Sequence, residues 1–260
     1  FLKNDLNDLC ISRPKSRLSW GIELPFNEEY VTYVWFDALI NYISAIGYNK
    51  NDKKFNYYWP ADYHLMAKDI LTTHCVYWPT MLMSCNITLP KTIFAHGWWL
   101  MNDTKMSKSI GNVIKPLELA DKYGSDALRY YLMRNMVLGQ DSSFTISSFN
   151  ERYNSDLAND YGNLVNRIFI LISKNFNNMI PTKAEFDLID RQLIDNVEKS
   201  RDLALANYNK LKIHDGIENS ISIFRFINKF LEDKAPWKTI KKDKKLAGST
   251  IYLSAEALRI

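Results

Sequence analysis

The sequence predicts an α/β domain over residues 1–139 and an all-helical domain over residues 140–260. In the first part, apolar and polar residues alternate from Tyr30 to Phe36, which is typical of a strand with one buried face. The run from Asp69 to Met83 has the length and apolar spacing of a helix. After Ser148 the apolar residues recur only at helical spacing. A short polar stretch separates the two patterns and marks the predicted boundary.

Two capping patterns predict where helices of the second part begin. Ser148 is followed three residues later by Glu151, and Thr182 by Glu185, so each pair fits a capping box. Pro181 is expected to end the helix between them. Two apolar stripes give the helices faces to bury, which predicts an antiparallel bundle. The stripes are Leu164, Ile168, Leu171 and Ile172, and Ile217, Ile221, Phe224 and Ile227.

Composition excludes several classes of protein without identifying one. With 47% hydrophobic and 24% charged residues among 260, the chain can bury one or two cores and is neither disordered nor membrane-spanning. Its net charge of +4 is compatible with a polyanionic partner but too small to identify a nucleic-acid-binding protein. Cys10, Cys75 and Cys85 have no paired spacing, so neither a zinc knuckle nor a disulfide framework is expected. Reduced thiols favour the cytoplasm.

The segment Lys105-Met106-Ser107-Lys108-Ser109 is suited to binding polyphosphate. Its two lysines can neutralise charge that develops on the β- and γ-phosphates, and its serines can donate to the remaining oxygens. An exposed basic turn is the alternative for the same composition. Upstream, the residues from Phe94 to Trp99 read as a strand interrupted by Gly97, followed by a polar hairpin turn, so the lysines are expected near a strand end.

The string Lys-Met-Ser-Lys-Ser resembles the second signature motif of class I aminoacyl-tRNA synthetases. Residues 33–39, residues 64–71, His74 and residues 77–79 are similar to segments of the methionyl-tRNA synthetases in particular. This resemblance covers essentially the whole chain. It implies the second half of a Rossmann-like catalytic domain with connector helices over residues 1–139, and an anticodon-binding helical bundle, incomplete at its end, over residues 140–260.

The resemblance also implies that part of the active site lies outside this chain. The first-half signature, His-x-Gly-His, is absent around the four histidines, His64, His74, His96 and His214. The family's zinc-bearing connective region precedes the matching segment, so no metal site is expected in these residues. We therefore expect the isolated chain to be inactive as an enzyme and to need the missing N-terminal half.

The implied reaction is the ATP-dependent activation of methionine, followed by its transfer to methionine tRNA. The methionine carboxylate attacks the α-phosphate, so catalysis is expected from positioning and charge stabilisation, with Mg²⁺ accompanying ATP. Two alternatives remain open: a class I synthetase for another hydrophobic amino acid, and a catalytically silent tRNA-binding module. No membrane partner is expected.

The resemblance assigns two sets of residues to the small substrates. Aromatic rings around a thioether gain sulfur contacts, although aromatic residues are more often plain core. Arg13 matches an arginine that faces the active site and, with Lys105 and Lys108, forms the expected catalytic set, a surface salt bridge being the alternative role for Arg13. The methionine-binding set is Trp35, Ala38, Leu39, Tyr42, Ile70 and His74, and the ATP-binding set is Asp69, Gly97, Trp99, Lys105, Ser107 and Lys108.

Three residues of the helical part are expected to read the anticodon. Asn163 and Arg167 are four residues apart and share a helix face, where both can hydrogen-bond to unstacked base edges. Trp237 matches the family's anticodon-stacking tryptophan, and an aromatic cap over the bundle is its alternative role.

Overall fold

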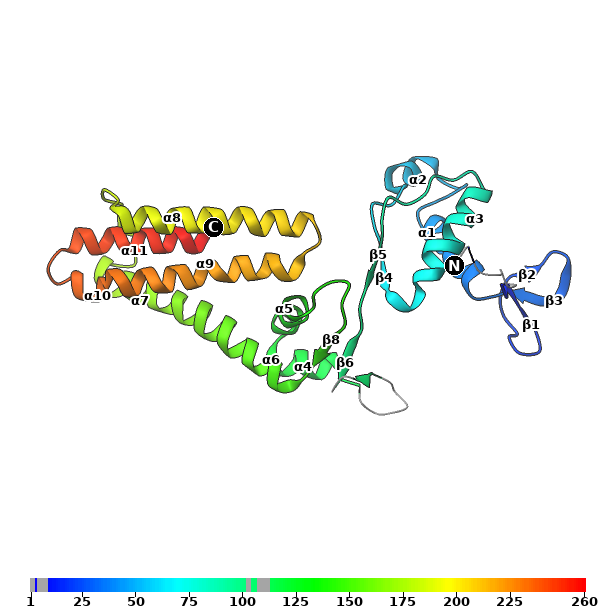
Figure 1. Ribbon diagram of the computed structural model, residues 1–260, viewed down its shortest axis with the longest axis horizontal. Helices are drawn as coiled ribbons and strands as arrows, with labels where there is room; N and C mark the ends of the chain where they lie inside the picture. Colours follow the sequence, from blue (N-terminus) through cyan, green and yellow to red (C-terminus); the bar gives the residue numbers. More distant parts are fainter. Residues whose placement is uncertain (1–2, 4–8, 102–103, 107–112) are drawn as a thin grey trace. The chain divides into compact units, whose positions relative to one another are not determined.

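The computed structural model describes residue 3 and residues 9–101, 104–106 and 113–260. The chain forms two compact units, Phe1–His96 and Gly97–Ile260, which are treated separately below (Figure 1). The predicted boundary at residues 139–140 lies inside the second unit, between its second helix and its third strand.

The first unit begins with a small antiparallel sheet of strand order β1-β3-β2. A parallel pair follows, in which His64 of β4 lies opposite Ile93 of β5, and three helical segments connect these two strands. Five buried residues form its core: Leu39, Ile43, Trp59, Trp78 and Leu82. The elements are β1 (Ser12–Pro14), β2 (Glu23–Leu24), β3 (Asn27–Thr32), α1 (Trp35–Ser44), α2 (Asp52–Tyr58), β4 (His64–Ala67), the 3₁₀-helix η1 (Lys68–Ile70), the π-helix η2 (Thr73–Tyr77), α3 (Trp78–Ser84) and β5 (Ile93–His96).

The predicted strand from Tyr30 to Phe36 is too long. Strand β3 ends at Thr32, and helix α1 already begins at Trp35. Val34 between them has φ 59° and ψ −130°, and a positive φ is unfavourable for a β-branched residue. This sharp turn makes Trp35 the first residue of a helix instead of an inward-facing strand residue.

The second unit contains a three-stranded sheet of order β7-β6-β8, in which β6 pairs antiparallel with β7 and parallel with β8. One core lies beside this sheet, around Tyr131, Phe144 and Phe149, and a second fills the helical bundle. The elements are β6 (Trp99–Met101), β7 (Thr104–Lys105), α4 (Pro116–Tyr123), α5 (Ser125–Asn135), β8 (Ser142–Phe144), α6 (Ile146–Arg152), the π-helix η3 (Tyr153–Gly162), α7 (Asn163–Phe176), α8 (Leu188–Asn209), α9 (Ile213–Lys234), α10 (Pro236–Thr239) and α11 (Lys244–Arg259).

The bundle confirms the predicted stripe of α7 and part of that of α9, because Phe224 and Ile227 belong to the core, whereas Ile217 and Ile221 lie outside it. Leu164, Ile168 and Ile172 of α7 and Ile227 of α9 are buried in one core, together with residues of α8 and α11. Figure 1 shows α8, α9 and α11 running side by side, while α6, η3 and α7 follow one another as a continuous helical run. The helical period of the apolar residues therefore predicts which helix faces are buried in the bundle.

Both predicted capping boxes are wrong. The N-cap of α6 is Thr145, whose hydroxyl accepts from the Ser148 backbone N–H at 3.0 Å, so Ser148 lies inside the helix. Helix α8 starts after Asp187, which forms a reciprocal capping box with Asp190. The preceding helix ends at Phe176, before Pro181, with Asn177 in the left-handed conformation.

Candidate functional site

A cluster of aromatic and histidine rings forms the centre of the first unit. Tyr42 on α1 contacts His74 on η2, with its hydroxyl oxygen 2.8 Å from His74 Nε2. The Nδ1 atom of His74 lies 2.9 Å from the carbonyl oxygen of Ile70. Because a carbonyl can only accept, Nδ1 carries a proton, and in this tautomer Nε2 accepts from the Tyr42 hydroxyl. Burial raises the pKa of Tyr42, which keeps this hydroxyl a donor.

Two further residues of this cluster were not predicted from the sequence. Trp78 donates its indole N–H to His64 Nε2 at 3.1 Å, and both side chains are buried. The Tyr42 ring lies 4.3 Å from the His64 ring and 5.9 Å from the Trp78 ring, measured between centroids. Burial, and to a smaller extent His74, lowers the pKa of His64. Trp78 lies four residues after His74 on the same helical run, a spacing that was visible in the sequence.

The other residues assigned to methionine have different surroundings. The Trp35 ring meets His74 edge-on at 6.1 Å, at the N-terminal end of α1. Leu39 is 1% exposed and belongs to the apolar core, whereas Ala38 is exposed. Ile70 is half-buried and supplies the carbonyl that orients His74. The structure therefore brings Trp35, Tyr42, Ile70 and His74 together.

The two polar residues predicted in this unit lie on separate elements. Arg13 on β1 places its guanidinium carbon 3.5 Å from the centroid of the Tyr33 ring, a cation–π contact. Asp69 is exposed in the 3₁₀-helix η1, next to Ile70.

In the second unit, Gly97 is required by a close approach of backbone. A Cβ atom at this position would lie 2.1 Å from the carbonyl oxygen of Gln140. The next residue, Trp98, donates its N–H to Asp141 Oδ1 at 2.9 Å, and its carbonyl accepts from the Ser142 N–H at 2.9 Å. The segments before β6 and β8 are therefore held together at Gly97.

The predicted nucleotide-binding residues of this unit differ in exposure. The Trp99 ring stacks on Tyr131 at 6.0 Å and meets Phe144 edge-on, so it packs against the core beside the sheet. Lys105 in β7 is exposed, with Nζ 4.1 Å above the Trp98 ring. Ser107 and Lys108 lie outside the described residues.

The predicted anticodon residues Asn163 and Arg167 line one groove of about 460 Å³ between η3, α7 and α9. The amide nitrogen of Asn163 donates to Asn159 Oδ1 at 3.3 Å. Trp237, in the short helix α10, is 39% exposed and does not line this groove. The complete lining is Asn159, Asp160, Asn163, Arg167, Arg225, Asn228, Lys229 and Glu232.

The described residues contain neither a candidate metal centre nor a candidate membrane-spanning helix. No three side chains of His, Cys, Asp or Glu in that part of the chain are grouped so that they could hold a metal ion. None of the helices within the described ranges combines the length and the apolar composition needed to cross a membrane.

Comparison with known proteins identifies the family. The family profile described as tRNA synthetases class I (M) matches residues 1–169. The methionine–tRNA ligases of Clostridium acetobutylicum and Listeria monocytogenes are 43% and 45% identical to the chain over 262 and 268 residues. These alignments include 100% of this chain but only 40% of each relative. A structure of Mycobacterium tuberculosis methionyl-tRNA synthetase in complex with methionyl-adenylate matches 98% of this chain and 50% of that one, with a TM-score of 0.91 and 36% identity. The chain therefore belongs to the class I tRNA synthetases of the methionine type.

Proposed function

We propose that this chain is part of a methionine–tRNA ligase that activates methionine with ATP and transfers it to methionine tRNA. The alignment of the entire chain with ligases of that name supports this proposal. Because the chain spans 40% of those relatives, the activity is assigned to a longer protein, and the isolated chain is expected to be inactive. The first unit and the β6–β8 sheet would supply the second half of a Rossmann-like catalytic domain, and the bundle would bind the anticodon in the cytoplasm.

The observation that carries the choice of methionine is the hydrogen-bonded pair of Tyr42 and His74 among aromatic rings. A thioether is polarizable and unbranched, so it gains contacts with ring edges and needs no charged partner. The same surroundings disfavour a charged side chain, because that charge would lose its hydration. Trp35, Ala38, Leu39 and Ile70 are proposed, from the resemblance to the family, to complete this pocket. The related Mycobacterium tuberculosis structure, which contains methionyl-adenylate, supports this assignment.

The second unit is proposed to contribute the lysines that act on ATP. When the methionine carboxylate attacks the α-phosphate, charge accumulates on the departing pyrophosphate, and Lys105 and Lys108 would stabilise it. Mg²⁺ bound to ATP would neutralise part of the triphosphate charge. A carboxylate is already a nucleophile, so no side chain needs to form a covalent intermediate. Ser107, Gly97, Trp99, Asp69 and Arg13 are proposed as further contacts to ATP or the adenylate.

The groove of the bundle is proposed to receive unpaired anticodon bases. Asn163 offers an amide oxygen, since its nitrogen donates to Asn159, and Arg167 offers several N–H groups. Such a mixture of donors and acceptors suits the Watson–Crick edge of an unstacked base. The exposed ring of Trp237 is available for stacking on another base.

Amino-acid-dependent exchange of pyrophosphate into ATP tests the proposed function. The complete enzyme should catalyse exchange with methionine far faster than with leucine, isoleucine or valine. A preference for one of these would favour a synthetase for another hydrophobic amino acid. No exchange with any amino acid, together with retained tRNA binding, would favour a silent tRNA-binding module. Exchange by the isolated chain would contradict the assignment of essential groups to the missing half.

A further inference from the structure

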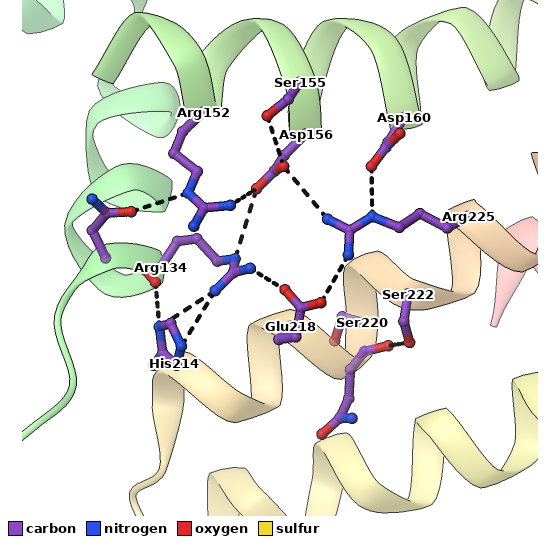
Figure 2. Close-up of polar contacts among 12 residues, drawn as sticks. Arg134, Arg152, Ser155, Asp156, Asp160, His214, Glu218, Ser220, Ser222 and Arg225 are labelled. Atoms are coloured by element: carbon purple, nitrogen blue, oxygen red, sulfur yellow. Dashed lines mark hydrogen bonds and ion pairs between the residues drawn. The ribbon is translucent and has the colours of Figure 1, made fainter. Parts of the chain in front are cut away.

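Arg225 on α9 connects three carboxylates with one guanidinium group. Its Nε atom lies 2.8 Å from Asp160 Oδ2, and its Nη1 atom lies 2.8 Å from Glu218 Oε1. Its Nη2 atom faces Asp156 Oδ1 at 3.6 Å (Figure 2). Asp156 and Asp160 both belong to the π-helix η3, whereas Glu218 is on the same helix as Arg225. Arg225 therefore ties α9 to η3 at two points, one turn apart.

Asp156 is the buried centre of these contacts. Its side chain is 2% exposed and is also approached by Arg152 at 3.5 Å and by Arg134 at 3.7 Å. The hydroxyl of Tyr130 on α5 donates to Asp156 Oδ2 at 2.7 Å. Burial, and then this hydrogen bond, raise the pKa of Tyr130, so its hydroxyl remains a donor. A carboxylate buried this deeply is stable only with its partners in place, so the contacts fix η3 in one position.

The same contacts reach the groove that contains Asn163 and Arg167. Asp160 and Arg225 line that groove, and Asp160 is three residues before Asn163. The amide nitrogen of Asn228 on α9 donates to the Asp160 carbonyl at 3.0 Å. A π turn contains more residues than an α turn, so η3 determines the direction in which the side chains at the start of α7 face. The position of η3 against α9 therefore decides how Asn163 and Arg167 are presented.

We propose that Arg225 is a positioning residue for anticodon recognition, because it holds η3 against α9 so that Asn163 and Arg167 face the groove. This inference rests on the proposed function of the groove. A planar guanidinium can address three carboxylates in different directions, whereas a lysine ammonium is a point charge on a flexible stem. Charge alone therefore does not suffice at position 225.

The experiment compares Arg225→Lys and Arg225→Met in the complete enzyme. A matched control is Arg201→Met, since Arg201 has the same side-chain exposure of 41% but pairs with its neighbour Asp202 on α8. The measurement is kcat/KM for charging methionine tRNA and for the same tRNA with its first anticodon base replaced, at a temperature where every variant is folded. In both Arg225 variants, kcat/KM for charging methionine tRNA should fall about tenfold or more, the usual effect of losing one base contact. Their kcat/KM for the altered tRNA should change little, so the ratio of kcat/KM between the two tRNAs falls. Arg201→Met should have the same kcat/KM values as the parent.

Two results would overturn the inference. In the first, Arg225→Lys charges methionine tRNA like the parent, and the charging rate of Arg225→Met depends less on salt concentration. Arg225 would then be a phosphate contact, because a point charge suffices for it. In the second, kcat/KM falls equally for both tRNAs and the melting temperature of the Arg225 variants falls. Arg225 would then only stabilise the bundle.

Asn163→Ala separates failure of this inference from failure of the proposed function. Unchanged discrimination in Asn163→Ala would refute the anticodon groove itself, and the inference with it. Lost discrimination in Asn163→Ala with parental behaviour of Arg225→Lys would refute the positioning role alone.

Discussion

Tyr42→Phe removes one hydroxyl from the proposed methionine pocket and leaves the ring in place. The hydroxyl lies 2.8 Å from His74 Nε2, and His74 is only 2% exposed. Since His74 Nδ1 already donates to the Ile70 carbonyl, Nε2 would lose its donor and remain buried. An unsatisfied buried polar atom costs about 1–3 kcal/mol, which corresponds to a factor of about 5–150 in an equilibrium constant.

We expect this cost to appear in two measurements on the complete enzyme. The denaturation midpoint should fall, and the dissociation constant for methionine should rise by about tenfold, whereas that for ATP should stay within about twofold. Tyr57→Phe is a matched control, because it makes the same change at a ring that is 81% exposed. Parental methionine affinity in Tyr42→Phe would refute the role of the pair in the pocket. An equal loss of methionine and ATP affinity would leave Tyr42 as a core residue.

Four further predictions concern other parts of the chain. Gly97→Ala should destabilise the β6–β8 sheet by about 1–3 kcal/mol or more, as measured by chemical denaturation, because its Cβ atom would overlap the Gln140 carbonyl; unchanged stability would contradict this contact. Lys108→Ala should slow adenylate formation by roughly 10²-fold with little change in methionine binding, and a parallel fall of both would refute a role in stabilising charge on pyrophosphate. Trp237→Ala should remove about 1–3 kcal/mol of tRNA recognition but leave charging of a microhelix without an anticodon unchanged, whereas equal losses on both would indicate a structural cap. The lowered pKa of His64 means that its contribution to stability is complete above pH 6.5 and is lost as the pH falls through the folded pKa, so a denaturation midpoint that does not decrease below pH 6.5 would contradict it.

Local periodicity predicted the buried faces of the helices, whereas the alternation from Tyr30 to Phe36 predicted too long a strand. The stripe of α7 is confirmed and that of α9 in part, because a helix that buries one face must repeat its apolar residues with the helical period. The predicted helix starts are wrong, because Ser148 and Thr182 are each followed three residues later by Glu, whereas the actual N-caps, Thr145 and Asp187, are not. Only the structure shows which hydroxyl or carboxylate accepts from the backbone.

The site was predicted less completely, because much of it depends on contacts between distant segments. Tyr42 and His74 were assigned to one pocket by resemblance, but the hydrogen bond between Trp78 and His64 joins a helix to a strand and has no sequence pattern. Arg134 donates to Glu218, although the two residues are 84 positions apart in the sequence. Such charged residues ordinarily occur on solvated faces. Burial of Asp156 among arginines could therefore not be anticipated from composition or spacing.

The close approach at Gly97 changes how a glycine in such a motif should be interpreted. Here the missing side chain makes room for the protein's own carbonyl group, at the crossing before two parallel strands. A descendant that lost every contact with nucleotide would still need this glycine in order to keep its sheet. Its presence is consequently a marker of architecture, and a diagnosis of nucleotide binding in distant sequences should depend on the lysines that follow it.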